Sequence, residues 1–273
     1  MSKQQYTVAD LLRVMQRLRD PETGCPWDIR QDFHTIVAST LEECYELAQA
    51  IEHEDYAHVA EELGDVLFQV VFYAQMGSER GLFDFDAIVN TLVEKLVRRH
   101  PHVFADGAIE GVVDQRTSVE AVRESWEAIK QCERNAKAQV GVLADVPLAL
   151  PALPRAQKLQ KRAARVNFDW PAESAVLDKL EEEIAELRAA LGEGDTAGVE
   201  EEMGDVLFTC VNLARHLGLD AESSLRHASG KFEQRFSRME RSAKAASTPL
   251  ETLTPSQLDA LWEEAKSAGL RQR

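Results

Sequence analysis

The sequence contains few of the residues that interrupt helices and few that cross-link a small fold. Its 273 residues include 9 prolines, 14 glycines and 4 cysteines. None of Cys25, Cys44, Cys132 and Cys210 forms a CxxC pair, which argues against a zinc knuckle or a disulfide framework. There is no apolar run long enough to cross a bilayer, and residues 1–6 lack the apolar core of a signal peptide. We therefore expect a reduced, cytoplasmic protein that does not enter membranes.

Positive charge is also scarce, because 47 acidic residues oppose 31 lysines and arginines and the formal net charge is −16. A surface this negative repels a phosphate backbone, so stable binding to nucleic acid is not expected. The acid is grouped in short clusters, such as 42–43, 61–62, 181–183 and 200–202. Each cluster is either a solvated helix face or part of a cation site.

Apolar residues recur at helical spacing along most of the chain, for example at Leu63, Val66, Leu67 and Val70. We therefore predict an all-α protein of roughly ten helices. A segment with several prolines divides the helical pattern into halves of similar length. The predicted organisation is an N-terminal domain, a linker and a C-terminal domain, at residues 1–138, 139–154 and 155–273.

The two halves repeat each other in one register. Residues 42–47 (EECYEL) pair with 182–187 (EEIAEL), and residues 61–68 (EELGDVLF) pair with 201–208 (EEMGDVLF). Both pairs are separated by 140 residues, and seven of the eight positions in the second pair are identical. An internal duplication accounts for this agreement more simply than chance.

The repeated blocks place carboxylates three residues apart, which puts them on one face of a helix. If the two helices of each half pack antiparallel, four carboxylates converge. Two like charges about 4 Å apart repel by roughly 4 kcal/mol at an effective dielectric of about 20, so a cation is expected between them. Oxygen-only ligation suits Mg²⁺, whereas a di-iron site would need Glu-x-x-His, which is absent. The predicted ligands are Glu183, Glu186, Glu202 and Asp205 in the C-terminal half, with a second candidate site at Glu43, Glu46, Glu62 and Asp65. A solvated acidic face remains the alternative.

A phosphate ligand also needs cations from the protein. Lys231 and Arg235 share one helix face, and Lys95 and Arg99 repeat that spacing in the first half. Ordinary solubilising charge is the competing explanation for such a pair. Trp262 lies in a C-terminal helical pattern, where it either caps the core or stacks on a nucleobase.

Several further stretches resemble the MazG family of nucleoside triphosphate pyrophosphohydrolases. They are RLRDP at 17–21, GCPWD at 24–28, RRHPHVF at 98–104, RAQK at 155–158, FDW at 168–170 and KFE at 231–233. Together with the acidic blocks they cover nearly the whole chain and are similar to the full-length, two-domain bacterial form. The chain departs from the family pattern at Asn167, where glycine commonly precedes the FDW stretch.

The resemblance implies tandem helical bundles of the all-α NTP pyrophosphatase type, assembled as a homodimer. It implies conversion of NTP and water to NMP and pyrophosphate, with broad tolerance of ribo- and deoxyribonucleotides. Mg²⁺ would be the cofactor and Mn²⁺ its substitute. The implied roles are nucleotide-pool cleaning and the starvation response. The second domain would carry the activity, with nucleotide contacts from Lys179, Glu183, Glu201, Lys231, Arg235 and Trp262.

A mechanism follows in which Glu182 takes a proton from the attacking water, while Lys231 and Arg235 neutralise the leaving pyrophosphate. Glu182 is the candidate because its counterpart Glu42 is also retained. Whether the N-terminal half is active or regulatory stays open, because it retains its carboxylates and cations. Two other functions also stay open: a non-catalytic helical dimer that binds nucleotides or partner proteins, and a narrower enzyme for dUTP or a modified nucleotide.

Overall fold

The computed structural model describes residues 5–111, 117–122, 125, 126, 129, 133 and 141–270. These residues form α-helices and two short 3-10 helices and contain no β-strand, which confirms the predicted all-α class. The chain divides into two compact units, Met1–Glu133 and Arg134–Arg273. The predicted domain end at residue 138 and the first two residues of the predicted linker lie outside the described residues.

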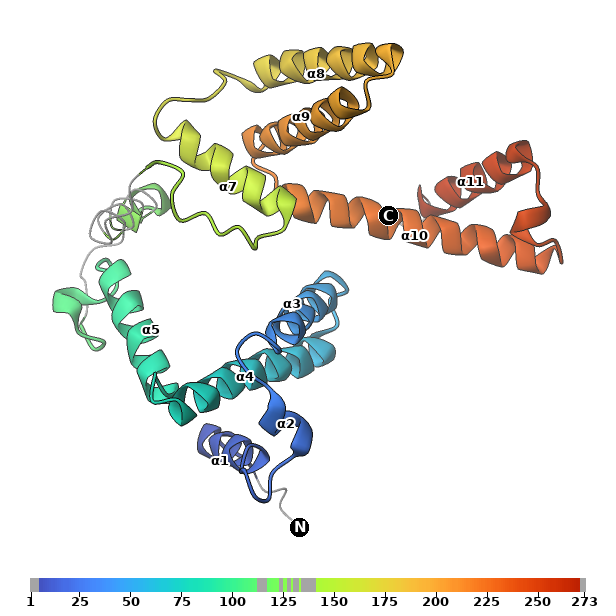
Figure 1. Ribbon diagram of the computed structural model, residues 1–273. Coiled ribbons are helices and arrows are strands. Elements are labelled where there is room, and N and C mark those ends of the chain that lie inside the picture. Colours follow the sequence, from blue (N-terminus) through green and yellow to red (C-terminus); the bar gives the residue numbers. More distant parts are fainter. Residues whose placement is uncertain are drawn as a thin grey trace. The chain divides into compact units, whose positions relative to one another are not determined.

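The first unit is built on a helical hairpin. Its elements are α1 (Val8–Leu18), α2 (Pro26–Arg30), α3 (Val37–Glu52), α4 (Tyr56–Glu79), α5 (Phe85–Arg99) and the 3-10 helix Ala105–Gly107. Helices α3 and α4 lie side by side, and α1 packs on α4 (Figure 1). The hairpin therefore brings the two acidic blocks of this half next to each other.

The core of the first unit consists of Met15, Ile36, Val71, Phe72 and Met76, which join α1, the start of α3 and the second half of α4. All five are at most 2% exposed. This core lies toward the end of α4, away from the acidic residues near its start. It holds the hairpin without using the carboxylates.

Arg19, in the RLRDP stretch, has a structural role. Its guanidinium donates hydrogen bonds to the backbone carbonyls of Asp28 and Gln31, and it forms an ion pair of 2.7 Å with Glu79. It also lies over the ring of Phe72. Arg19 thus ties the loop after α1 and helix α2 to α4.

The second unit repeats the hairpin and adds two C-terminal helices. Its elements are α7 (Ala152–Ala164), α8 (Glu173–Glu193), α9 (Thr196–His216), α10 (Ala221–Ala245), the 3-10 helix Leu250–Thr252 and α11 (Pro255–Leu270). Helices α8 and α9 lie side by side, α7 packs on α9, and α11 folds back along α10 (Figure 1). Helix α7 begins at Ala152, inside the segment predicted as the linker. Among the described helices, none combines the length and apolarity needed to cross a bilayer.

The turns of the two hairpins show that the duplication extends to backbone geometry. Asp55 caps α4 and Asp195 caps α9, each through a side-chain oxygen that accepts a backbone N–H. The residue before each cap has a positive φ, 55° at Glu54 and 72° at Gly194. These pairs are again 140 residues apart. Asn167 likewise has φ 62°, a conformation that glycine adopts most readily and asparagine tolerates.

Candidate metal centre

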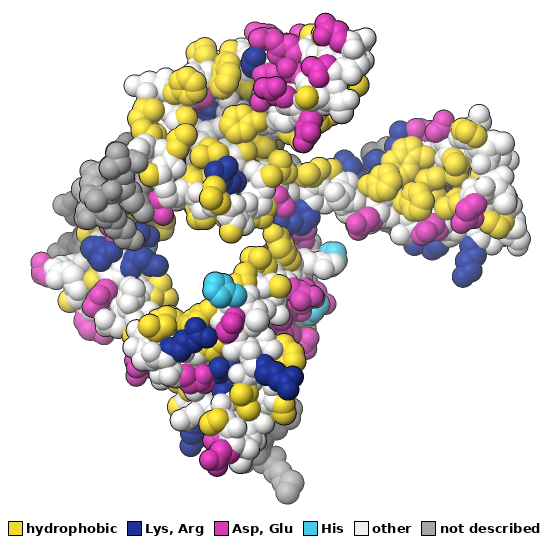
Figure 2. Space-filling view, viewed as in Figure 1, with side chains coloured by type: hydrophobic (Ala, Val, Ile, Leu, Met, Phe, Trp, Pro, Cys, Tyr) yellow, Lys and Arg dark blue, Asp and Glu magenta, His cyan; other side chains and the backbone are white. Residues whose placement is uncertain are grey.

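The second unit brings three of the four predicted C-terminal ligands together. Glu183 and Glu186 project from α8 and Glu202 from α9, and one carboxylate oxygen from each lies within 4.8 Å of the others. Acidic side chains gather over this hairpin (Figure 2). Glu183 is buried and Glu202 half-buried, whereas Glu186 is exposed. A fully solvated acidic face does not describe this cluster.

The cluster is electrostatically unfavourable without a cation. The pKa of Glu202 is raised, first by burial and then by the negative charges of Glu186, Glu183 and Asp205. Asp205, the fourth predicted ligand, is exposed on α9 and lies outside the group of three, but its charge acts on Glu202. A hard dication fits this set of oxygen donors because it neutralises the crowded charge.

Lys179, predicted to contact nucleotide, lies on α8 beside the cluster. Its ammonium is 2.8 Å from Oε1 of Glu182 and 3.0 Å from Oε1 of Glu183. These contacts raise the pKa of Lys179, the Glu182 hydrogen bond most of all. Glu182, the predicted proton acceptor, is therefore paired with a cation and remains exposed to solvent.

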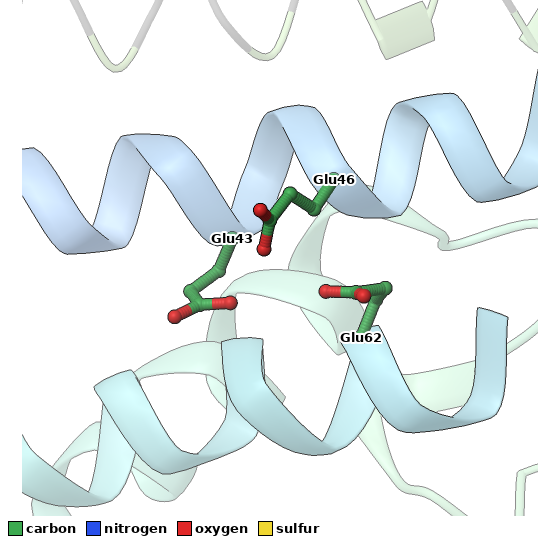
Figure 3. A group of neighbouring side chains, drawn as sticks. All are labelled: Glu43, Glu46 and Glu62. Carbon is green, nitrogen blue, oxygen red and sulfur yellow. The ribbon is translucent and has the colours of Figure 1, made fainter. Parts of the chain in front are cut away.

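The first unit holds an equivalent cluster. Glu43 and Glu46 from α3 meet Glu62 from α4, again with one oxygen of each within 4.8 Å of the others (Figure 3). Burial raises the pKa of Glu43, and the charges of Asp65, Glu46 and Glu62 raise it further. Asp65 is exposed and lies outside the group of three.

His58 joins this first cluster although it was not predicted as a site residue. Its Nε2 lies 2.6 Å from Oε1 of Glu62. The separation of four residues on α4 is a signal that sequence reasoning had available, because residues that far apart are neighbours on a helix.

The predicted phosphate-binding cations do not reach the carboxylates within the described part of the chain. Lys231 is exposed on α10 and forms no ion pair there. Arg235 lies with its guanidinium 5.7 Å from the ring centre of Trp262, which also contacts Phe232 at 5.4 Å. Trp262 thus belongs to an aromatic group between α10 and α11, where hydrophobic side chains gather in Figure 2. Glu201 is exposed on α9, next to Glu202.

The corresponding cations of the first unit have a different environment. Arg99 and Arg98 both bind the carboxylate of Glu133, and the Arg99 contact measures 2.5 Å. The paired guanidinium groups lower the pKa of Glu133 to about 2. Lys95 is half-buried on α5. Arg99 therefore makes an internal ion pair that Arg235 lacks among the described residues.

A profile of the MazG nucleotide pyrophosphohydrolase domain matches this chain twice, over residues 31–104 and 172–239. The matched segments contain both hairpins and both carboxylate clusters. The chain belongs to the MazG family. Trp262 lies beyond the second matched segment.

Individual MazG relatives align along nearly the whole chain. The nucleoside triphosphate pyrophosphohydrolase of Escherichia coli K12 is 50% identical over 94% of this chain and 95% of its own length. The nucleoside triphosphate pyrophosphohydrolase/pyrophosphatase MazG of Thermotoga maritima is 43% identical, with 94% of each chain covered. YabN of Bacillus subtilis is 40% identical, and the match covers 94% of this chain and 51% of YabN. The two-domain MazG arrangement is thus shared with the first two relatives over their full span.

Proposed function

We propose that this MazG enzyme hydrolyses nucleoside triphosphates to nucleoside monophosphates and pyrophosphate at the cluster between α8 and α9. The observation that carries the proposal is the convergence of Glu183, Glu186 and Glu202, with their oxygens within 4.8 Å, inside the segment that the family profile matches. Relatives of nearly the same length are nucleoside triphosphate pyrophosphohydrolases. The chemistry of the donors and the family agree on a phosphate-bearing substrate with a divalent cation.

The cofactor of this site is Mg²⁺, with Mn²⁺ as a substitute, held by Glu183, Glu186, Glu202 and Asp205. When bound, the cation neutralises phosphate charge and makes a water molecule more acidic. Lys179 keeps the carboxylates of Glu182 and Glu183 in position through its 2.8 and 3.0 Å contacts. Glu182 is exposed and accepts the proton that the attacking water loses.

The remaining predicted residues bind the substrate. Lys231 and Arg235 bind phosphate oxygens and stabilise the departing pyrophosphate, since neither has an ion-pair partner among the described residues. Trp262, beside Arg235, provides a stacking surface for the base. Glu201 is placed at the substrate on the family resemblance alone.

The N-terminal half has a structural or regulatory role in this proposal. Two differences support it. Position 39, which corresponds to Lys179, is a serine, and Arg99 is bound to Glu133 and is not available for phosphate. Without these two cations, the first unit retains a carboxylate cluster but lacks the means to bind a triphosphate.

We also place the enzyme in the cytoplasm and propose that it functions as a homodimer. Exposed apolar side chains recur beside both clusters, at Leu63 and Leu67 in the first hairpin and at Met203 and Leu207 in the second. A second copy of the chain would remove these surfaces from water. Light scattering after size-exclusion chromatography tests this, and a monomeric mass at micromolar concentration would contradict it.

The reaction is tested by ³¹P NMR of full-length protein with Mg²⁺ and a panel of NTPs and dNTPs. We expect NMP and pyrophosphate from every common base. Production of NDP and phosphate would refute the reaction, and turnover confined to dUTP or one modified nucleotide would refute the broad tolerance. Glu183→Ala and Asp205→Ala are expected to abolish pyrophosphate release. Full activity in either variant would refute the site.

A further inference from the structure

One carboxylate oxygen of the first unit has no partner. Glu62 is only 6% exposed, and its Oε1 is held by His58 Nε2 at 2.6 Å. Its Oε2 is buried and has no hydrogen-bond partner among the described residues. A buried carboxylate oxygen is expensive to leave unpaired, so this atom calls for a ligand.

The surroundings of Glu62 identify the kind of ligand. Glu43 and Glu46 face it from α3, and the three carboxylates lie between the two helices (Figure 3). One oxygen of each is within 4.8 Å of the others. A ligand that satisfies three negatively charged oxygens is a cation, and a set made only of oxygen donors selects a hard divalent one.

We propose that Glu43, Glu46 and Glu62 form a second divalent-cation site, in which His58 is a positioning residue that holds one oxygen of Glu62 and leaves the other for the cation. The arrangement is the usual one for a ligating carboxylate, whose other oxygen accepts a hydrogen bond from a neighbouring side chain. Glu62 has this second contact before any cation arrives. The site is thus arranged in advance, and this cation site is distinct from the proposed hydrolytic centre on α8 and α9.

The two sites differ at two positions, with a consequence for cation binding. The C-terminal cluster has the ammonium of Lys179 3.0 Å from Glu183, whereas the corresponding position in the first half is Ser39. The position that corresponds to His58 is Gly198, so Glu202 has no such partner. A neighbouring ammonium opposes a dication. The N-terminal site therefore binds its cation without nucleotide and more tightly than the C-terminal site does.

Mn²⁺ titration of the full-length, nucleotide-free protein, followed by electron paramagnetic resonance, tests the site. Glu62→Gln keeps the size of the side chain and removes its charge, and Glu202→Gln is the matched change in the other half. We expect the tightest class of Mn²⁺ sites to weaken at least about 10-fold in Glu62→Gln, the scale of lost contacts around a metal, and to persist in Glu202→Gln. A Glu62→Gln curve that superimposes on the wild-type curve, or loss of the tightest class in Glu202→Gln, would overturn the proposal.

Glu46→Gln is the second variant if circular dichroism shows that Glu62→Gln does not fold. Glu46 is exposed, so its replacement does not disturb the core, and it should weaken the same class of sites. Unchanged Mn²⁺ affinity in a folded Glu46→Gln would refute the site.

The role of His58 is tested by a loss and a rescue. His58→Ala should weaken Mn²⁺ binding about 10-fold, and His58→Gln, whose amide can donate to Glu62, should recover most of it. Equal affinity in His58→Ala and wild type would refute the positioning role. All these assays omit nucleotide, so their outcome is independent of whether the C-terminal site releases pyrophosphate.

Discussion

Replacing Glu43 by glutamine should make the cation-free protein more stable. Glu43 has a carboxylate oxygen within 4.8 Å of those of Glu46 and Glu62, and its pKa is raised by burial and by these charges. At that separation each like-charge pair repels by about 0.9 kcal/mol at a dielectric near 80 and about 3.5 kcal/mol near 20. Glutamine has the same size and a similar helix propensity. Removing the charge should therefore stabilise the first unit by about 1–3 kcal/mol at neutral pH.

Differential scanning calorimetry of the full chain in EDTA measures this gain, which corresponds to about 3–10 °C in Tm. Glu42→Gln is the control, because it makes the same change in net charge on the next residue of α3 while contributing least among the charges that raise the pKa of Glu43. It should move Tm by less than a third as much. A Glu43→Gln variant that is less stable than wild type in EDTA, or no more stable than Glu42→Gln, would refute the view that the carboxylates repel one another.

Three further predictions concern the fold. Met15→Ala should destabilise the first unit by about 2–4 kcal/mol in urea unfolding, because Met15 is fully buried in its core; a loss under 1 kcal/mol would contradict that packing. Glu54→Gly should stabilise it by about 0.5–1 kcal/mol, since glycine suits a φ of 55° as Gly194 does in the second hairpin, and a lower Tm would argue against this strain. Glu133→Gln should destabilise by about 1–2 kcal/mol at pH 7, because the pKa of Glu133 lies at about 2 instead of its ordinary 4.5. That stability is present above pH 4.5 and is lost as the pH falls toward 2, so urea unfolding should show the difference from wild type shrinking in that window; a constant difference would contradict the ion pair.

The repeat accounts for what could be predicted from the sequence. Helical spacing and a constant separation of 140 residues predicted two equivalent hairpins, and the structure has them, with matching caps at Asp55 and Asp195. Residues three apart on one helix face it together, so Glu43 with Glu46 and Glu183 with Glu186 could be paired without coordinates. Their meeting with Glu62 and Glu202 required only that the hairpins close.

Contacts between distant elements could not be predicted in this way. Arg99 binds Glu133, which lies 34 residues further along the chain, and no periodicity links the two. The position of Arg235 over Trp262 depends on how α11 folds back along α10. Such contacts are decided by tertiary packing. They separate the two halves, whose carboxylate motifs are nearly the same.

The central claim is that hydrolysis occurs at the C-terminal cluster and not at its N-terminal counterpart. Glu186 and Glu46 occupy the same position in the two halves and are both exposed, so their glutamine variants are matched. The decisive measurement is kcat/KM for pyrophosphate release from a dNTP with Mg²⁺. We predict a loss of at least about 100-fold, or about 2.7 kcal/mol of transition-state stabilisation, in Glu186→Gln, and a change of less than about 3-fold in Glu46→Gln. Equal losses in the two variants, or a loss in Glu46→Gln alone, would contradict the account.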